Sequence, residues 1–225
     1  YILFSKLFMV NYNNGAKTGG ETFWYTNAKK ARELNWVDGV QHGEIHQWNP
    51  MGYTLLKGEY FMGVPQGTWE WYDERGRSIK ETEFENGTGV FYDFAFVQGD
   101  GEEGRDLVLI TEKSYREGRL HGTEIRYYPD GSLRSEIHFK NGVKTGKFTE
   151  WYDNGAVFRE GSFKDDKPYS IVQEYHPYDK EGGKARPQIA KEIAYADDQI
   201  HAIVTEFSAE GKKLLTMELK NGKPD

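Results

Sequence analysis

The sequence contains no cysteine, which excludes disulfide bonds, thiol catalysis and metal sites built on thiolates. It also contains no apolar run of 18 residues, so no segment of it could cross a membrane as a helix. Apolar residues make up only 37% of the chain, and the mean hydropathy is −0.80. Aromatic residues offset this shortage, because 6 Trp, 15 Tyr and 13 Phe can each bury roughly 150–250 Å². The 225 residues are therefore enough for a folded core.

Positive charge is also in short supply, with 29 Lys and Arg against 36 Asp and Glu and a net charge of −7. Since nucleic-acid binders usually present a basic face, we expect no nucleic-acid partner. Attachment to an anionic membrane surface has no support from the charge either. Because the chain begins at Tyr1 rather than at methionine, its localisation cannot be read from the N-terminus.

The most informative feature is an internal repeat of 24 residues, which is clearest in residues 64–87, 119–142 and 143–166. Residues 16–39 and 40–63 fit the same frame. The remaining residues form longer, shorter or partial units, namely 1–15 (the second half of a unit), 88–118, 167–199 and 200–222. We therefore predict one repeat domain that covers residues 1–225.

Glycine and aromatic residues recur at fixed positions of this frame. Glycine recurs at positions 4, 13 and 24. Aromatic residues occupy position 9, in Trp24, Trp48, Tyr72, Tyr127, Trp151 and Tyr175. They also occupy position 21, in Trp36, Tyr60, Phe84, Phe139 and Phe163. We expect these two aromatic columns to form the core. Partial exposure of one column, for stacking on sugars or lying at a lipid interface, is the alternative.

Each unit has the pattern of a β-hairpin. Asp130-Gly131 and Asn154-Gly155 are hairpin-turn pairs. They separate short runs rich in β-branched and aromatic residues. A helix is excluded because glycine recurs about every 10–12 residues, at a cost of roughly 1 kcal/mol each. We therefore predict an all-β fold in which tandem hairpins form an elongated, twisted antiparallel sheet, open and solenoid-like.

The pattern of glycine and aromatic positions resembles the MORN-repeat family, in its bacterial variant that is often labelled the YwqK-type antitoxin family. Residues 67–72, 122–128 and 146–152 carry the resemblance, each with its downstream aromatic residue. Ser170 and Ile203 depart from it, since they stand where position 4 should be glycine. The resemblance implies a scaffold for protein contacts and, in some members, association with membrane lipid. The antitoxin label implies binding and silencing of a toxic partner.

No motif points clearly to catalysis. Residues 99–104 read G-x-G-x-x-G, but three acidic residues fill this loop and a strand follows it, so we interpret it as an acidic hairpin tip rather than a nucleotide site. Its carboxylates lack the spacing of a calcium loop. His42 and His46 would lie roughly 13 Å apart on a strand, too far apart for one zinc ion. We therefore predict a non-enzymatic protein with no catalytic, cofactor-binding or metal-binding residues.

Two units carry insertions, at residues 94–106 and 176–188, and repeat proteins often bind through such insertions. The candidate partner contacts are Tyr92, Phe94, Phe96, Tyr178 and Arg186. The alternative is that both insertions are tolerated lengthenings of a turn.

The leading hypothesis is thus a scaffold for protein–protein interaction, with a protein partner whose identity the sequence does not give. An antitoxin-like neutraliser of a toxic protein, and a lipid or glycan binder at the cell envelope, are the alternatives. The compartment and the oligomeric state stay open, although a bacterial cell-envelope or exported protein is favoured over a cytoplasmic one.

Overall fold

A computed structural model describes residues 7–98, 105–177 and 187–224 of the chain. These residues form 18 β-strands and no helix, which confirms the predicted all-β class. With no helix in the described ranges, none is present that could span a membrane. The strands are joined as antiparallel hairpins, and within each sheet every strand pairs with its neighbours in the chain.

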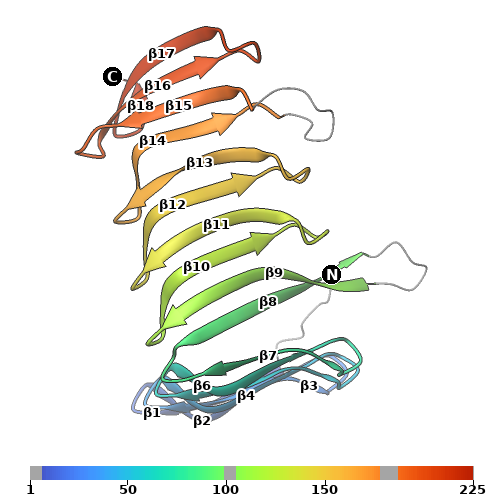
Figure 1. Ribbon diagram of the computed structural model, residues 1–225. Coiled ribbons are helices and arrows are strands. Elements are labelled where there is room, and N and C mark those ends of the chain that lie inside the picture. Colours follow the sequence, from blue (N-terminus) through green and yellow to red (C-terminus); the bar gives the residue numbers. More distant parts are fainter. Residues whose placement is uncertain (1–6, 99–104, 178–186, 225) are drawn as a thin grey trace. The chain divides into compact units, whose positions relative to one another are not determined.

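The strands form two sheets, each in strict chain order (Figure 1). The first sheet contains β1 (Leu7–Asn13), β2 (Ala16–Trp24), β3 (Lys30–Val37), β4 (Val40–Trp48), β5 (Thr54–Phe61), β6 (Val64–Tyr72) and β7 (Ser78–Phe84). The second sheet contains β8 (Gly89–Gln98), β9 (Arg105–Arg116), β10 (Arg119–Tyr127), β11 (Leu133–Lys140), β12 (Val143–Trp151), β13 (Val157–Lys164), β14 (Lys167–Tyr175), β15 (Ile189–Tyr195), β16 (His201–Phe207), β17 (Lys213–Lys220) and β18 (Lys223–Pro224).

The sequence predicts one continuous sheet, whereas β7 and β8 are consecutive strands in different sheets. Between them the pairing is reduced to a single bridge, Glu85 with Thr88. Just beyond it Gly89 lies so close to Phe84 that an added Cβ would come within 2.8 Å of the ring. The contacts of the chain group it into two compact units, Tyr1–Phe91 with Tyr115–Arg119, and Tyr92–Ser114 with Leu120–Asp225. That the repeats form one domain stays a prediction.

The regular 24-residue units each contain one hairpin, and its tip has a recurrent geometry. In the unit 119–142 the Tyr128 N–H donates to the Ser132 carbonyl, and the Gly131 N–H donates to the Tyr128 carbonyl. Gly131 has a φ of 84°, which glycine adopts without steric cost. The Asp130 carboxylate accepts the Ser132 N–H at 2.8 Å. Asp130-Gly131 is therefore the turn that the sequence predicts.

The most buried column of the repeat is position 6, not the predicted positions 9 and 21. Of the aromatic residues at positions 9 and 21, only Phe84 is buried, and the others are partly exposed. In six units no position-6 residue is more than 6% exposed, and these residues are Glu21, Ile45, Trp69, Glu124, Phe148 and Val172. In the irregular units 88–118 and 200–222, Asp93 and Thr205 at this position are partly exposed. Sequence inspection missed this column because its members share burial but not chemistry.

Strand register explains why position 6 forms the core. Position 6 pairs with position 19 of its own unit, as Glu21 does with Leu34. It also pairs with position 19 of the preceding unit, as Ile45 does with Leu34. Both positions point to one face of the sheet, so the core is a row that runs across the strands. Trp69 is the largest residue in the row of the first sheet and is completely buried.

Two units have glycine at position 19, and both glycines make room for large core side chains. A Cβ on Gly58 would lie 2.3 Å from the Trp69 indole. A Cβ on Gly161 would lie 2.8 Å from Val172 and 3.0 Å from Phe148. In these two rows the packing therefore requires a residue without a side chain at position 19.

Gly58→Ala should destabilise the protein by about 1–3 kcal/mol, because the added Cβ would overlap the indole of the fully buried Trp69. Urea unfolding measures this change. Gly20→Ala is the matched control, since the nearest atom to its added Cβ is the Asn35 Oδ1 at 3.8 Å. It should change stability by no more than about 0.5 kcal/mol. Equal effects of the two substitutions would contradict the packing argument.

Successive units are bonded to one another at their hairpin tips. Three tyrosines at position 10 donate their hydroxyls to the position-9 carbonyl of the next unit: Tyr25 to Trp48 at 2.7 Å, Tyr128 to Trp151 at 2.7 Å and Tyr152 to Tyr175 at 2.8 Å. In the unit 167–199 an imidazole takes this role, with the Nε2 of His176 2.9 Å from the Phe207 carbonyl oxygen.

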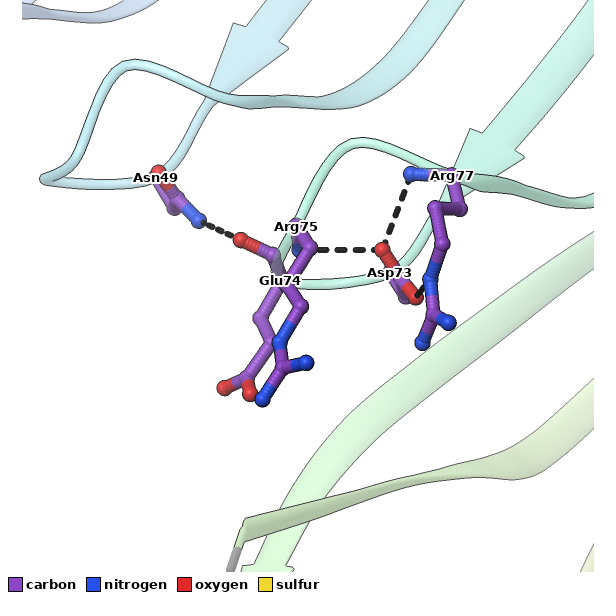
Figure 2. Close-up of polar contacts among 5 residues, drawn as sticks. All are labelled: Asn49, Asp73, Glu74, Arg75 and Arg77. Carbon is purple, nitrogen blue, oxygen red and sulfur yellow. Dashed lines mark hydrogen bonds and ion pairs between the residues drawn. The ribbon is translucent and has the colours of Figure 1, made fainter.

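The tip of the unit 40–63 uses an amide instead. The Asn49 Nδ2 donates to the Glu74 carbonyl of the next tip at 2.6 Å (Figure 2). In that next tip the Asp73 carboxylate accepts the backbone N–H groups of Arg75 and Arg77 at 2.9 Å each. The bond from the Arg77 backbone is the main reason why the pKa of Asp73 lies below its ordinary value. The tip of the unit 64–87 is thus ordered internally and is attached to the tip of the unit before it.

The opposite edge of the sheets is bonded through the backbone. The N–H of Gly39 donates to the Lys17 carbonyl at 2.8 Å, and the N–H of Gly63 donates to the Gln41 carbonyl at 2.7 Å. Gly142 and Leu120 repeat the pattern in the second sheet at 2.7 Å. Each return turn is therefore bonded to the one before it, and the hairpins are fixed at both ends.

Tyr152→Phe should lower stability by about 0.5–1.5 kcal/mol, because it deletes the hydroxyl that satisfies the Tyr175 carbonyl. Tyr53→Phe serves as its control. That side chain is 50% exposed, and its hydroxyl makes no hydrogen bond within the described ranges. Urea unfolding that gives the same small change for both variants would show that the tip bond adds nothing to stability.

Candidate binding surface

Each sheet has two faces, which differ in chemistry. One face carries positions 6, 8, 17, 19 and 21 and contains the core row. The other carries positions 5, 7, 9, 18 and 20, and we call it the polar face. Its position-9 rings are partly exposed, and carboxylates recur at position 18, in Glu33, Glu81, Glu136 and Glu160.

In the second sheet the position-9 tyrosines bond to acidic side chains of the polar face. The Tyr175 hydroxyl donates to Glu160 at 2.6 Å, and the Tyr127 hydroxyl donates to Glu112 at 3.0 Å. Burial first, and these carboxylates second, raise the pKa of each phenol to about 12. The hydroxyls therefore stay protonated as donors at neutral pH, and the rings are held in place.

In the first sheet two of the position-9 rings lie beside lysine ammonium groups. The Lys30 Nζ lies 5.9 Å from the centroid of the Trp48 ring, and the Lys57 Nζ lies 5.5 Å from that of Tyr72. His46 stacks on Trp48 with 4.1 Å between centroids. Burial chiefly, and the charge of Lys57 in addition, lower the pKa of His46 below its ordinary value. His46 is therefore neutral at pH 7, and the cations on these rings are lysines.

Three of the predicted contact residues come together on one strand. Tyr92, Phe94 and Phe96 occupy alternate positions of β8, so their side chains share a face of it. Phe96 is 39% exposed. The described ends of the insertion belong to strands, residues 94–98 to β8, which has 10 residues, and residues 105–106 to β9, which has 12. Lys113 and Asp93 form an ion pair across this hairpin.

The other two predicted contacts, Tyr178 and Arg186, lie outside the described residues, as does the G-x-G-x-x-G segment 99–104. At the second insertion the His176 N–H donates to the Gln188 carbonyl at 2.9 Å, so hairpin pairing continues to the border of the described chain. That the two insertions act as one partner contact stays a prediction.

No arrangement for metal-assisted chemistry is present in residues 7–98, 105–177 and 187–224, where no three His, Asp or Glu side chains gather as ligands. The six histidines of the chain include several that bond to nearby groups, such as His138 to the Lys147 carbonyl at 2.9 Å. That the protein has no metal, cofactor or catalytic residue stays a prediction.

Comparison with protein-family models gives a match to the MORN repeat variant at residues 120–141 and 144–165. These segments correspond to the repeat units 119–142 and 143–166, that is, to the hairpins β10–β11 and β12–β13. No curated protein matches the chain. MORN repeats are commonly involved in binding and are generally non-catalytic. The two segments are therefore similar to the MORN repeat variant, as the resemblance of the sequence implies.

Proposed function

We propose that this chain is a non-enzymatic scaffold that binds another protein through the aromatic strip Tyr92, Phe94 and Phe96 on β8. The observation that carries the proposal is the alignment of these side chains on a lengthened strand, with Phe96 39% exposed. Aromatic side chains are enriched in the centres of protein interfaces because they bury a large area at a low entropic cost.

The bonded edges of the hairpins support this role. A surface held rigid before binding loses little conformational freedom when the partner docks. Side-chain bonds at the tips and backbone bonds at the return turns connect neighbouring hairpins, such as those of the units 119–142 and 143–166. The units can therefore present fixed side chains without a partner to order them.

The antitoxin-like and the lipid- or glycan-binding hypotheses stay alternatives. No observation on the described residues favours either one over a protein scaffold. The net charge of −7 acts against an anionic lipid surface. If the partner were a toxic enzyme, the antitoxin-like role would be one form of the scaffold function.

Affinity capture from a lysate of the native host tests the proposal, with Phe94→Ser/Phe96→Ser as the variant. The wild-type chain should retain one protein in a stoichiometric amount, and the variant should lose it by at least about tenfold, since a central aromatic contact contributes about 2 kcal/mol or more. Phe61→Ser is the matched control. Its side chain is 61% exposed on the first sheet, so its capture should equal that of the wild type.

Melting curves must accompany the capture. Because Phe96 is partly exposed, the variant should melt within a few degrees of the wild type. A folded wild-type bait that retains nothing would refute the scaffold proposal. Full retention by the double variant would refute the role of the β8 strip.

A further inference from the structure

Three of the return turns, each after a hairpin whose two strands are described, have the sequence Asn-Gly. They are Asn86-Gly87, Asn141-Gly142 and Asn221-Gly222. The three asparagines have φ values of 49°, 53° and 52°, and the three glycines are left-handed as well. Because the backbone conformation is the same, a difference in the chemical reactivity of these turns must come from their contacts.

In the first two turns the glycine nitrogen is held by a backbone hydrogen bond. The N–H of Gly87 donates to the Pro65 carbonyl at 3.0 Å, and the N–H of Gly142 donates to the Leu120 carbonyl at 2.7 Å. Each bond fixes the nitrogen in place and keeps its proton directed at a carbonyl oxygen. The glycine nitrogen is therefore hindered from reacting as a nucleophile.

In the third turn the bond falls one residue earlier. The N–H of Asn221 donates to the Ile200 carbonyl at 2.9 Å, and the Gly222 N–H has no acceptor in the described part of the chain. Both residues of this turn are exposed. The Gly222 nitrogen is thus open to water and to the side chain that precedes it.

The cause lies in the strand register of the unit 200–222. In the unit 119–142 the pairing of β10 with β11 ends at Gly122, whose left-handed φ of 102° displaces the next bond by one residue. The unit 200–222 has Ile203 where position 4 should be glycine, and no residue of β16 is left-handed. The pairing therefore continues without displacement to His201↔Lys220, and Asn221 takes the bond.

We propose that Asn221 is a site of spontaneous deamidation, at which the Gly222 backbone nitrogen attacks the carbonyl carbon of the Asn221 side chain. The nitrogen gives up its proton to water, and the new N–C bond closes a five-membered succinimide ring. The C–N bond of the side-chain amide breaks, and its nitrogen takes up a proton and leaves as ammonia. Glycine offers no side chain to hinder the attack.

Water then opens the succinimide at either of its two carbonyls and gives aspartate or isoaspartate. The isoaspartyl product carries the main chain through the former side chain of Asn221. Both products add one negative charge. The reaction therefore changes the turn that joins β17 to β18.

Incubation of the full chain at mildly alkaline pH, followed by peptide mapping with mass spectrometry, tests the proposal. Conversion of an amide to an acid changes the mass of the peptide that contains it. Asn221 should react at least about fivefold faster than Asn141, because attack at Asn141 must first break the hydrogen bond of Gly142. Asn221→Gln should abolish the mass change of its peptide.

Asn141 is a matched control in the same chain, since each of the two asparagines follows a lysine and precedes a glycine. In concentrated urea, where the folded contacts are lost, the two should react at equal rates. The same ratio of rates in urea as in the native chain, or a smaller ratio than expected in the native chain, would overturn the proposal.

Asn86 tests whether the glycine bond is the protecting contact. The Asn141 Oδ1 also lies 3.0 Å from the His121 Nδ1, whereas the Asn86 side chain has no hydrogen bond within the described ranges. The Gly87 bond alone should therefore keep Asn86 as slow as Asn141. Deamidation of Asn86 as fast as that of Asn221 would refute the assigned cause.

Discussion

The structure depends on the register of its strands. This register places position 6 of a unit between two residues at position 19, one from the same unit and one from the preceding unit. A single hairpin is marginal in water because it can cover little of its own apolar surface. Here Ile45 lies opposite Leu34 of the preceding unit and Gly58 of its own. Each core side chain therefore needs a neighbouring hairpin, and folding of one unit is tied to folding of the next.

Next to the core row lies a second row, formed by positions 8 and 17, and its residues differ between the two sheets. At positions 8 and 17 the second sheet places Glu150, Arg159 and Glu174 on successive strands, with Arg159 3.7 Å from one glutamate and 3.5 Å from the other. In the first sheet the corresponding row contains Leu56 and Trp71, both buried. One repeat thus supports an alternating ionic row in the second sheet and a buried apolar pair in the first, where Arg32, Gln47 and Lys80 occupy the other places of the row.

The sequence predicts the repeat length, the hairpins and their turns, because Asp130-Gly131 and the spaced glycines act through local backbone geometry. It does not reveal the core column, in which a glutamate such as Glu124 and an indole such as Trp69 stand at equivalent positions. It marks Ile203 as a departure from glycine, but the bond that moves from Gly222 to Asn221 follows only from strand register. The candidate strip on β8 was found because unit-specific aromatics stand out in a repeat. Its place on a strand rather than in a turn was not foreseen, because an insertion can lengthen either.

The bonds at the hairpin tips have a consequence for how such a chain can change length. A unit such as 143–166 brings a donor for the next unit, the Tyr152 hydroxyl, and an acceptor for the previous one, the Trp151 carbonyl. A gene segment that encodes one unit would carry both halves of the connection when it is duplicated. The new hairpin would bond to its neighbours on either side without any further substitution, so the number of units can vary while the joint between them stays the same.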